Sequence, residues 1–110
     1  MTAKFELKKS TNGQYYFNLK AVNGEVILSS EMYQSKEGAE NGIESVSKNA
    51  ALDEHYERKI SVKDEPYFIL KAANGEPIGR SEMYSTTAAM ENGIASVKAN
   101  APAAMVDDQT

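Results

Sequence analysis

In the first thirty residues, apolar and polar side chains alternate in short runs that are separated by Asn-Gly pairs. This pattern is typical of β-strands joined by hairpins. It predicts strands over 4–10, 15–21 and 25–30, with turns at Thr11-Asn12-Gly13 and Val22-Asn23-Gly24.

The next segment changes period, because apolar residues recur there every three or four positions. This spacing predicts a helix over about 36–48. Ser35 suits the N-cap of this helix, and Asn49 suits a left-handed C-terminal cap. Gly42 lies on the apolar face, where glycine costs roughly 1 kcal/mol against alanine. We therefore expect close approach of the helix to a sheet or to a second helix, and a hinge or ligand role is the alternative.

The same pattern returns, without a gap, after a shift of 51 residues. Positions 5–51 and 56–102 share 24 identities in 47 aligned pairs, which indicates a tandem duplication. The second copy predicts a helix over about 87–99, with Thr86 as its N-cap, Gly93 on its apolar face and Asn100 at its end. The first Asn-Gly turn is replaced by Lys63-Asp64-Glu65-Pro66, so that loop is expected to differ.

The register of each hairpin can be inferred by asking which loop length places the large apolar residues on one face of the sheet. A two-residue loop at Asn23-Gly24 would place Leu19 beside Leu28. A three-residue loop with Gly24 in the left-handed conformation places Leu19 beside Ile27 instead, and Leu70 beside Ile78. We favour the second register because it gathers the large apolar residues on one face. The predicted core is Phe17, Leu19, Ile27, Ile43 and Val46 with their counterparts Phe68, Leu70, Ile78, Ile94 and Val97. Phe5 and Leu7 are expected opposite Leu19 and Phe17.

A chain of 110 residues is expected to form one domain, because two separate 50-residue domains would each bury too little surface. We predict a single α+β domain over 1–110. It is built from repeats over 4–54 and 55–107, followed by a tail over 108–110.

Composition narrows the classes of function. The net charge of −4 and the pI near 5.0 argue against a nucleic-acid partner, while leaving room for a local basic patch. There is no cysteine, and His55 is the sole histidine, so no thiolate or two-histidine chemistry is available. No stretch of eighteen apolar residues occurs, so we expect a soluble cytoplasmic protein with no membrane contact.

Three groups of residues carry potential chemistry, and each has a plainer interpretation. The repeated acids Glu31, Glu82, Glu40 and Glu91 are expected to be solvated, because nothing places two of them together. Asp53-Glu54-His55 contains metal-ligand types, but adjacent residues rarely converge on one ion, so we interpret His55 as a linker residue. Ser29, Ser30 and Ser45 have no histidine base within the repeat. The sequence thus predicts no catalytic, metal or cofactor site and no cofactor.

The sheet face that points away from the helices is the remaining candidate. Alternation turns a mixed set of residues outward there: Tyr16, Asn18, Lys20, Val26 and Leu28, with their counterparts Tyr67, Ile69, Lys71, Pro77 and Gly79, flanked by Glu6, Lys8, Glu57 and Lys59. A sheet with helices on one side leaves the other side open. We take Tyr16, Lys20, Tyr67 and Lys71 as the candidate contact residues. An ordinary solvated sheet face is the alternative.

The sequence therefore favours a non-enzymatic interaction or structural module, with a protein partner or self-association through this face. Two other functions stay open. One is single-stranded nucleic-acid binding by the same face. The other is small-molecule binding at the pseudo-twofold between the repeats.

The doubled pattern Phe17-x-Leu19-x-Ala21-x-Asn23-Gly24, Tyr33-x-Ser35 and Gly42-Ile43-x-Ser45-Val46-x-x-Asn49-Ala50 closely resembles the YegP-like family of small tandem-repeat proteins of unknown function. The resemblance covers about 4–106. It implies two β-β-β-α-(β) motifs that share one antiparallel sheet, with two helices on one face. It also implies that C-terminal strands near Asp53–Tyr56 and Ala104–Asp107 are exchanged between the motifs. The family implies no activity, cofactor or functional residue.

Overall fold

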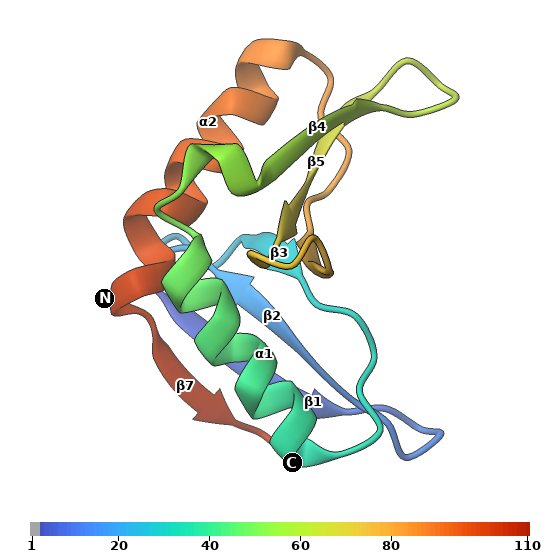
Figure 1. Ribbon diagram of the computed structural model, residues 1–110, viewed down its shortest axis with the longest axis vertical. Coiled ribbons are helices and arrows are strands. Elements are labelled where there is room, and N and C mark those ends of the chain that lie inside the picture. Colours follow the sequence, from blue (N-terminus) through green and yellow to red (C-terminus); the bar gives the residue numbers. More distant parts are fainter. Residues whose placement is uncertain (1–2) are drawn as a thin grey trace.

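The computed structural model describes residues 3–110, which form seven strands, two α-helices and two short 3-10 helices (Figure 1). The first repeat supplies β1 (Lys4–Lys9), β2 (Tyr15–Lys20), β3 (Val26–Ser29), α1 (Lys36–Asn49) and η1 (Asp53–His55). The second repeat supplies β4 (Tyr56–Ile60), β5 (Pro66–Lys71), β6 (Pro77–Arg80), α2 (Thr87–Asn100), η2 (Ala101–Ala103) and β7 (Met105–Asp108).

The strands form one sheet in the order β4-β5-β6-β3-β2-β1-β7. The two repeats meet at its centre, where Ser29 of β3 pairs with Arg80 of β6. Both helices pack on one face, since α1 contacts β1, β2, β5 and β6 while α2 contacts β3 and β5. The predicted α+β fold of two tandem motifs with helices on one face is confirmed. The sheet is mixed rather than wholly antiparallel, because β7 runs parallel to β1.

Strand exchange between the motifs occurs on one side only. Residues 105–108 leave the second repeat and pair with β1 of the first, as the resemblance implied. Residues 53–55 instead form a 3-10 helix, and Tyr56 begins β4 within its own repeat. The reason is connectivity: the chain that leaves α1 must itself become β4, so it cannot also add a strand beside β4. The outer edge of β4 is therefore one edge of the sheet.

The predicted hairpin register is confirmed in part and wrong in part. Gly24 adopts φ 86°, as the three-residue loop requires, and Phe5 and Leu7 pair with Leu19 and Phe17 as predicted. The predicted pairs Leu19–Ile27 and Leu70–Ile78 are wrong, because a β-bulge follows each loop and shifts the register. Leu19 consequently pairs with Leu28, and Leu70 pairs with Gly79. The bulge lets Ile27 and Leu28 both enter the core, so the prediction that Leu28 faces outward is also wrong.

The first turn of the second repeat keeps the shape of its counterpart, contrary to expectation. Asp64 takes the left-handed conformation, with φ 62°, that Gly13 takes in the first repeat. The backbone bonds Ser61 N–H to Glu65 O and Asp64 N–H to Ser61 O repeat those made at Ser10 and Gly13. Aspartate tolerates this conformation better than most residues, which explains why the substitution leaves the turn unchanged.

The helices begin where the sequence predicts and end differently. The side-chain oxygens of Ser35 and Thr86 accept bonds from the Gly38 and Ala89 amides, so both N-caps are confirmed. Asn49 and Asn100 are not left-handed caps: each stays helical, and its Nδ2 donates to the carbonyl four residues earlier, at 2.8 and 2.7 Å. No helix within residues 3–110 is long and apolar enough to cross a membrane.

The mid-helix glycines mark close approach, as predicted. A Cβ added at Gly42 would lie 2.4 Å from the Tyr33 hydroxyl, and one at Gly93 would lie 2.2 Å from the Tyr84 hydroxyl. The rings of these tyrosines stack on Phe17 and Phe68. Each glycine therefore makes room for a tyrosine that is inserted between helix and sheet.

The core is continuous across the two repeats, and every residue predicted for it is buried. At the centre of this core, the two repeats differ at one pair of counterpart positions, Leu28 and Gly79. Leu28 is 1% exposed, and a Cβ added at its repeat counterpart Gly79 would lie 2.6 Å from Leu28 Cδ2. One leucine thus fills the space beside the pseudo-twofold that two would have to share.

Candidate functional site

The sheet face opposite the helices, called the outer face below, is not covered by any element within residues 3–110. A single row of paired residues crosses all seven strands on it: Glu57, Ile69, Arg80, Ser29, Asn18, Glu6 and Asp107. Arg80 and Ser29 are counterparts in the repeat, as are Ile69 and Asn18, and Glu57 and Glu6. The row is therefore pseudo-symmetric about its centre, with arginine on one side of the axis and serine on the other.

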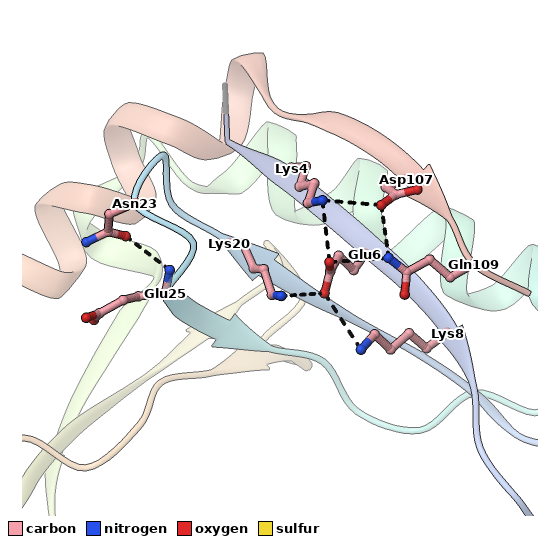
Figure 2. Close-up of polar contacts among 8 residues, drawn as sticks. All are labelled: Lys4, Glu6, Lys8, Lys20, Asn23, Glu25, Asp107 and Gln109. Atoms are coloured by element: carbon pink, nitrogen blue, oxygen red, sulfur yellow. Dashed lines mark hydrogen bonds and ion pairs between the residues drawn. The ribbon is translucent and has the colours of Figure 1, made fainter. Parts of the chain in front are cut away.

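The same charged cluster is built once in each repeat. In the first, Glu6 lies 3.1 Å from the Lys20 ammonium and 3.7 Å from that of Lys8 (Figure 2). In the second, Glu57 lies 3.1 Å from Lys71 and 3.6 Å from Lys59. Alternation along β1, β2, β4 and β5 places these side chains on the outer face. Two of the predicted contact residues, Lys20 and Lys71, therefore have matched surroundings.

The two clusters differ in their neighbours and in their exposure, because β7 lies beside the first cluster. It brings Asp107 and the following Gln109 beside β1, and Lys4 pairs with both Asp107 and Glu6, at 3.4 and 3.6 Å (Figure 2). The Glu6 side chain is only 6% exposed, whereas that of Glu57, on the edge strand, is 41% exposed.

Neighbouring ammonium groups keep the Glu6 carboxylate ionised. Burial raises its pKa, but the ammonium groups of Lys20 and Lys8 outweigh burial and leave the pKa lowered. The Lys20 ammonium approaches Oε1 without forming a well-directed hydrogen bond, so the contact is best described as an ion pair. Lys71 and Lys59 likewise lower the pKa of Glu57. Both carboxyl groups are ionised at neutral pH.

Positive charge exceeds negative charge on the outer face. Its described strand positions hold six cations and three carboxylates: Lys4, Lys8, Lys20, Lys59, Lys71 and Arg80 against Glu6, Glu57 and Asp107. These strand positions carry +3, although the whole chain carries −4. Half of the twelve basic residues lie there, with three of the sixteen acids.

Among the polar side chains on this face that have no partner within residues 3–110 are an arginine and two tyrosines. Arg80 makes no hydrogen bond, ion pair or ring contact, and neither do the side chains of Tyr16 and Tyr67. The other four tyrosines all have one. Lys9 lies over the Tyr15 ring, Tyr33 and Tyr84 stack on phenylalanines, and the Tyr56 hydroxyl donates to Ala50 O at 2.7 Å. Within residues 3–110, both tyrosines that lack a side-chain partner thus lie on the outer face, together with unpartnered Arg80.

The structure places all four predicted contact residues on this surface, where each is half-buried. Sequence reasoning missed Arg80, although a signal was present: it is a strongly basic residue at a strand position whose repeat counterpart is serine. It also missed Asp107 and Gln109, because no local pattern tells beside which strand a C-terminal segment will lie.

The remaining candidate residues serve local roles, and Arg58 brings two of them, Asp53 and Glu91, together. Glu91 accepts two bonds from Arg58, at 2.6 and 3.1 Å, and Asp53 binds Arg58 and Lys98. The His55 ring meets Asn49 Oδ1 at 2.7 Å. Within residues 3–110, no three of His, Cys, Asp and Glu are grouped so as to hold a metal ion.

Two hollows in the described surface each belong to a single repeat. One lies along α1 and is lined by Asn41, Glu44, Ser45, Lys48 and Asn49. The other lies between β4 and α2 and is lined by Arg58, Lys59, Ile60, Thr87, Met90 and Glu91. Neither lies between the repeats, so neither supports a small-molecule site at the pseudo-twofold.

Comparison with known proteins identifies the family. A domain of unknown function, DUF1508, matches the chain twice, over residues 10–57 and 61–108. The UPF0339 protein YegP of Yersinia pestis is 57% identical over 106 residues, which cover 96% of this chain and 95% of that protein. A UPF0339 protein of Shewanella oneidensis is 52% identical over 110 residues, which cover all of both chains.

Two solution NMR structures share the fold. That of yegP from E. coli, described as a protein of unknown function, has a TM-score of 0.95 at 52% identity and covers 100% of this chain and 95% of its own. That of a UPF0339 protein from Shewanella oneidensis has a TM-score of 0.92 at 52% identity and covers 98% and 92%. With two repeat matches and full-length relatives, this chain belongs to the UPF0339 (YegP) family of tandem DUF1508 proteins.

Proposed function

We propose that this protein is a non-enzymatic binding module that holds an anionic partner on its outer face. The observation that carries the proposal is the gathering of unpartnered Arg80, Tyr16 and Tyr67 on a surface whose strand positions carry +3. Tyrosine and arginine are the side chains that most often dominate binding energy at interfaces. A cation that has no internal partner gives up no existing ion pair when a partner binds.

The lysines add attraction at longer range. Each repeat has more ammonium groups around its glutamate than that carboxylate can neutralise, so the surplus acts outward. The rest of the chain is acidic, which would orient an anionic partner toward the outer face and away from the helices.

The first test is retention on immobilised heparin, an anionic polymer. A protein of net charge −4 should not bind heparin unless a local basic face does so. We expect the native chain to be retained at low salt. The fourfold variant Tyr16→Ser, Lys20→Ser, Tyr67→Ser and Lys71→Ser should flow through while it keeps a native circular dichroism spectrum.

The control variant removes two cations elsewhere. Among residues 3–110, Lys48 on α1 pairs with Glu44 alone, and Lys63 lies in an exposed turn. Lys48→Ser with Lys63→Ser should elute as the native chain does. Equal weakening in the control and in the face variant would mean that total charge, not the outer face, governs retention, and the proposal would fail.

A further inference from the structure

The partner of the outer face can be narrowed by the chemistry of its free groups. We infer that the outer face binds single-stranded nucleic acid, with Tyr16 and Tyr67 stacking on bases and Arg80 contacting the backbone or a base between them. This inference rests on the proposed function and adds the class of the partner.

The two unpartnered rings favour a single strand as the partner. An acidic protein could also pack against these rings, but it need not offer a planar π-surface beside each anionic group, as a nucleotide does. Bases of a single strand present exposed π-faces, and stacking on an aromatic side chain is a common way in which proteins hold them. Bases inside a duplex are already stacked, so a duplex cannot use these rings.

A lysine lies beside each of the two rings. Lys8 pairs across the strands with Tyr16, and Lys59 pairs with Tyr67, so each ring has an ammonium-bearing neighbour on the same face. A nucleotide that stacks on the ring would place its phosphate near that lysine. The pseudo-twofold makes two such ring-and-lysine pairs, one in each repeat.

Arg80 lies between the two rings on the outer face. Tyr16 and Tyr67 lie on β2 and β5, which are separated by β3 and β6, and Arg80 lies on β6 between them. Strand spacing and residue rise put the two tyrosines about 20 Å apart, a span of several nucleotides. Arg80 therefore lies under the middle of a strand that reaches from one ring to the other. A guanidinium there can contact phosphate bidentately or stack on a base.

The net charge of −4 argued against this partner when only the sequence was considered. The fold separates the charges, so a chain that is acidic as a whole presents a basic sheet face. Affinity for phosphate depends on the cations that the strand touches, together with the screening of the remaining charge by salt.

The test uses the full-length protein and a fluorescently labelled 12-nucleotide single-stranded RNA of mixed sequence, followed by anisotropy at 50 and 200 mM salt. We expect saturable binding that weakens with salt, and weaker binding of the matching duplex. Arg80→Ser, which installs the residue of the other repeat, should weaken binding about tenfold and flatten the logarithmic salt slope by about 0.7. Lys63→Ser, in an exposed turn, should change neither quantity.

A second readout isolates stacking. The chain has six tyrosines and no tryptophan, so its intrinsic emission comes from tyrosine. Binding should quench part of this emission. The pair Tyr16→Ser and Tyr67→Ser should abolish both the quenching and most of the affinity, whereas Tyr16→Phe with Tyr67→Phe should restore the affinity.

The outcomes separate the two proposals. If heparin retention depends on the outer face but the RNA binds no more tightly than its duplex, or binds without dependence on the tyrosines, then the nucleic-acid inference is wrong and the binding module stands. If heparin retention also fails, both are wrong. Equal effects of Arg80→Ser and Lys63→Ser would likewise overturn the inference.

Discussion

Exchanging Leu28 and Gly79 tests whether the two repeats share one core about a pseudo-twofold. These residues are repeat counterparts, and a Cβ at Gly79 would lie 2.6 Å from Leu28 Cδ2 and 2.7 Å from its Cγ. Their surroundings are duplicated, since Leu19, Ile27 and Phe17 have identical counterparts in the second repeat. One leucine should therefore fit equally well from either side, whereas two or none should not.

The magnitudes follow from packing. Leu28→Gly removes a side chain that is 1% exposed and should cost at least the roughly 2–5 kcal/mol of a buried leucine truncation. Gly79→Leu forces a second leucine into occupied space and should cost about 1–3 kcal/mol or more. The double variant Leu28→Gly with Gly79→Leu keeps the total volume, so its cost should be below about 1.5 kcal/mol.

The assay is urea denaturation followed by circular dichroism, with the free energy of unfolding taken from the midpoint and slope for each of the four proteins. If the two positions share one space, the double variant should be more stable than either single variant. Additive costs, as found for independent sites, would show that the two positions do not share one space, and the pseudo-twofold packing would then be refuted.

Four further predictions concern local features and the whole fold. Asp64→Ala should lower the free energy of unfolding by about 1 kcal/mol while Asp64→Gly should not, because φ is 62° there, and thermal melts would show the difference. Ser35→Ala and Thr86→Ala should each cost about 1 kcal/mol in urea melts through loss of an N-cap. Lys36 lowers the pKa of Asp108 to about 2, so this ion pair should stabilise β7 above pH 4 and lose that effect as the pH falls toward 2. Amide exchange of residues 105–108 should accordingly become faster, relative to the unfolded chain, as the pH falls over this range. The variant Lys36→Met should not show this pH dependence. A fragment of residues 1–51 lacks β6 and β7 and should be unfolded or dimeric, and a monomeric fragment that melts cooperatively would contradict a shared core.

Local sequence patterns predicted much of the fold. Alternation and Asn-Gly turns located the strands of the first repeat, and Ser35 and Thr86 marked the helix starts. The duplication then transferred these three strands and the helix to the second repeat. These features are set within a few residues, so the sequence expresses them directly.

What the sequence could not show depends on contacts between distant segments. The bulge that buries Leu28 recurs in the second repeat, and the predicted register did not include it in either copy. The place of β7 beside β1 is a choice between two sheet edges, β1 and β4, that no local pattern encodes. Of the candidate site, alternation supplied Tyr16, Lys20, Tyr67 and Lys71. The central place of Arg80 required the pairing of β3 with β6.

The measurement that tests the central claim most directly is an NMR titration of the isotope-labelled full-length protein with a short heparin oligosaccharide. If the outer face binds an anionic partner, shifts should concentrate on outward residues of β2, β5 and β6, including the Arg80 guanidinium and the rings of Tyr16 and Tyr67, while α1 and α2 stay unchanged. Shifts confined to the helices, or none at concentrations up to the millimolar range, would contradict the account.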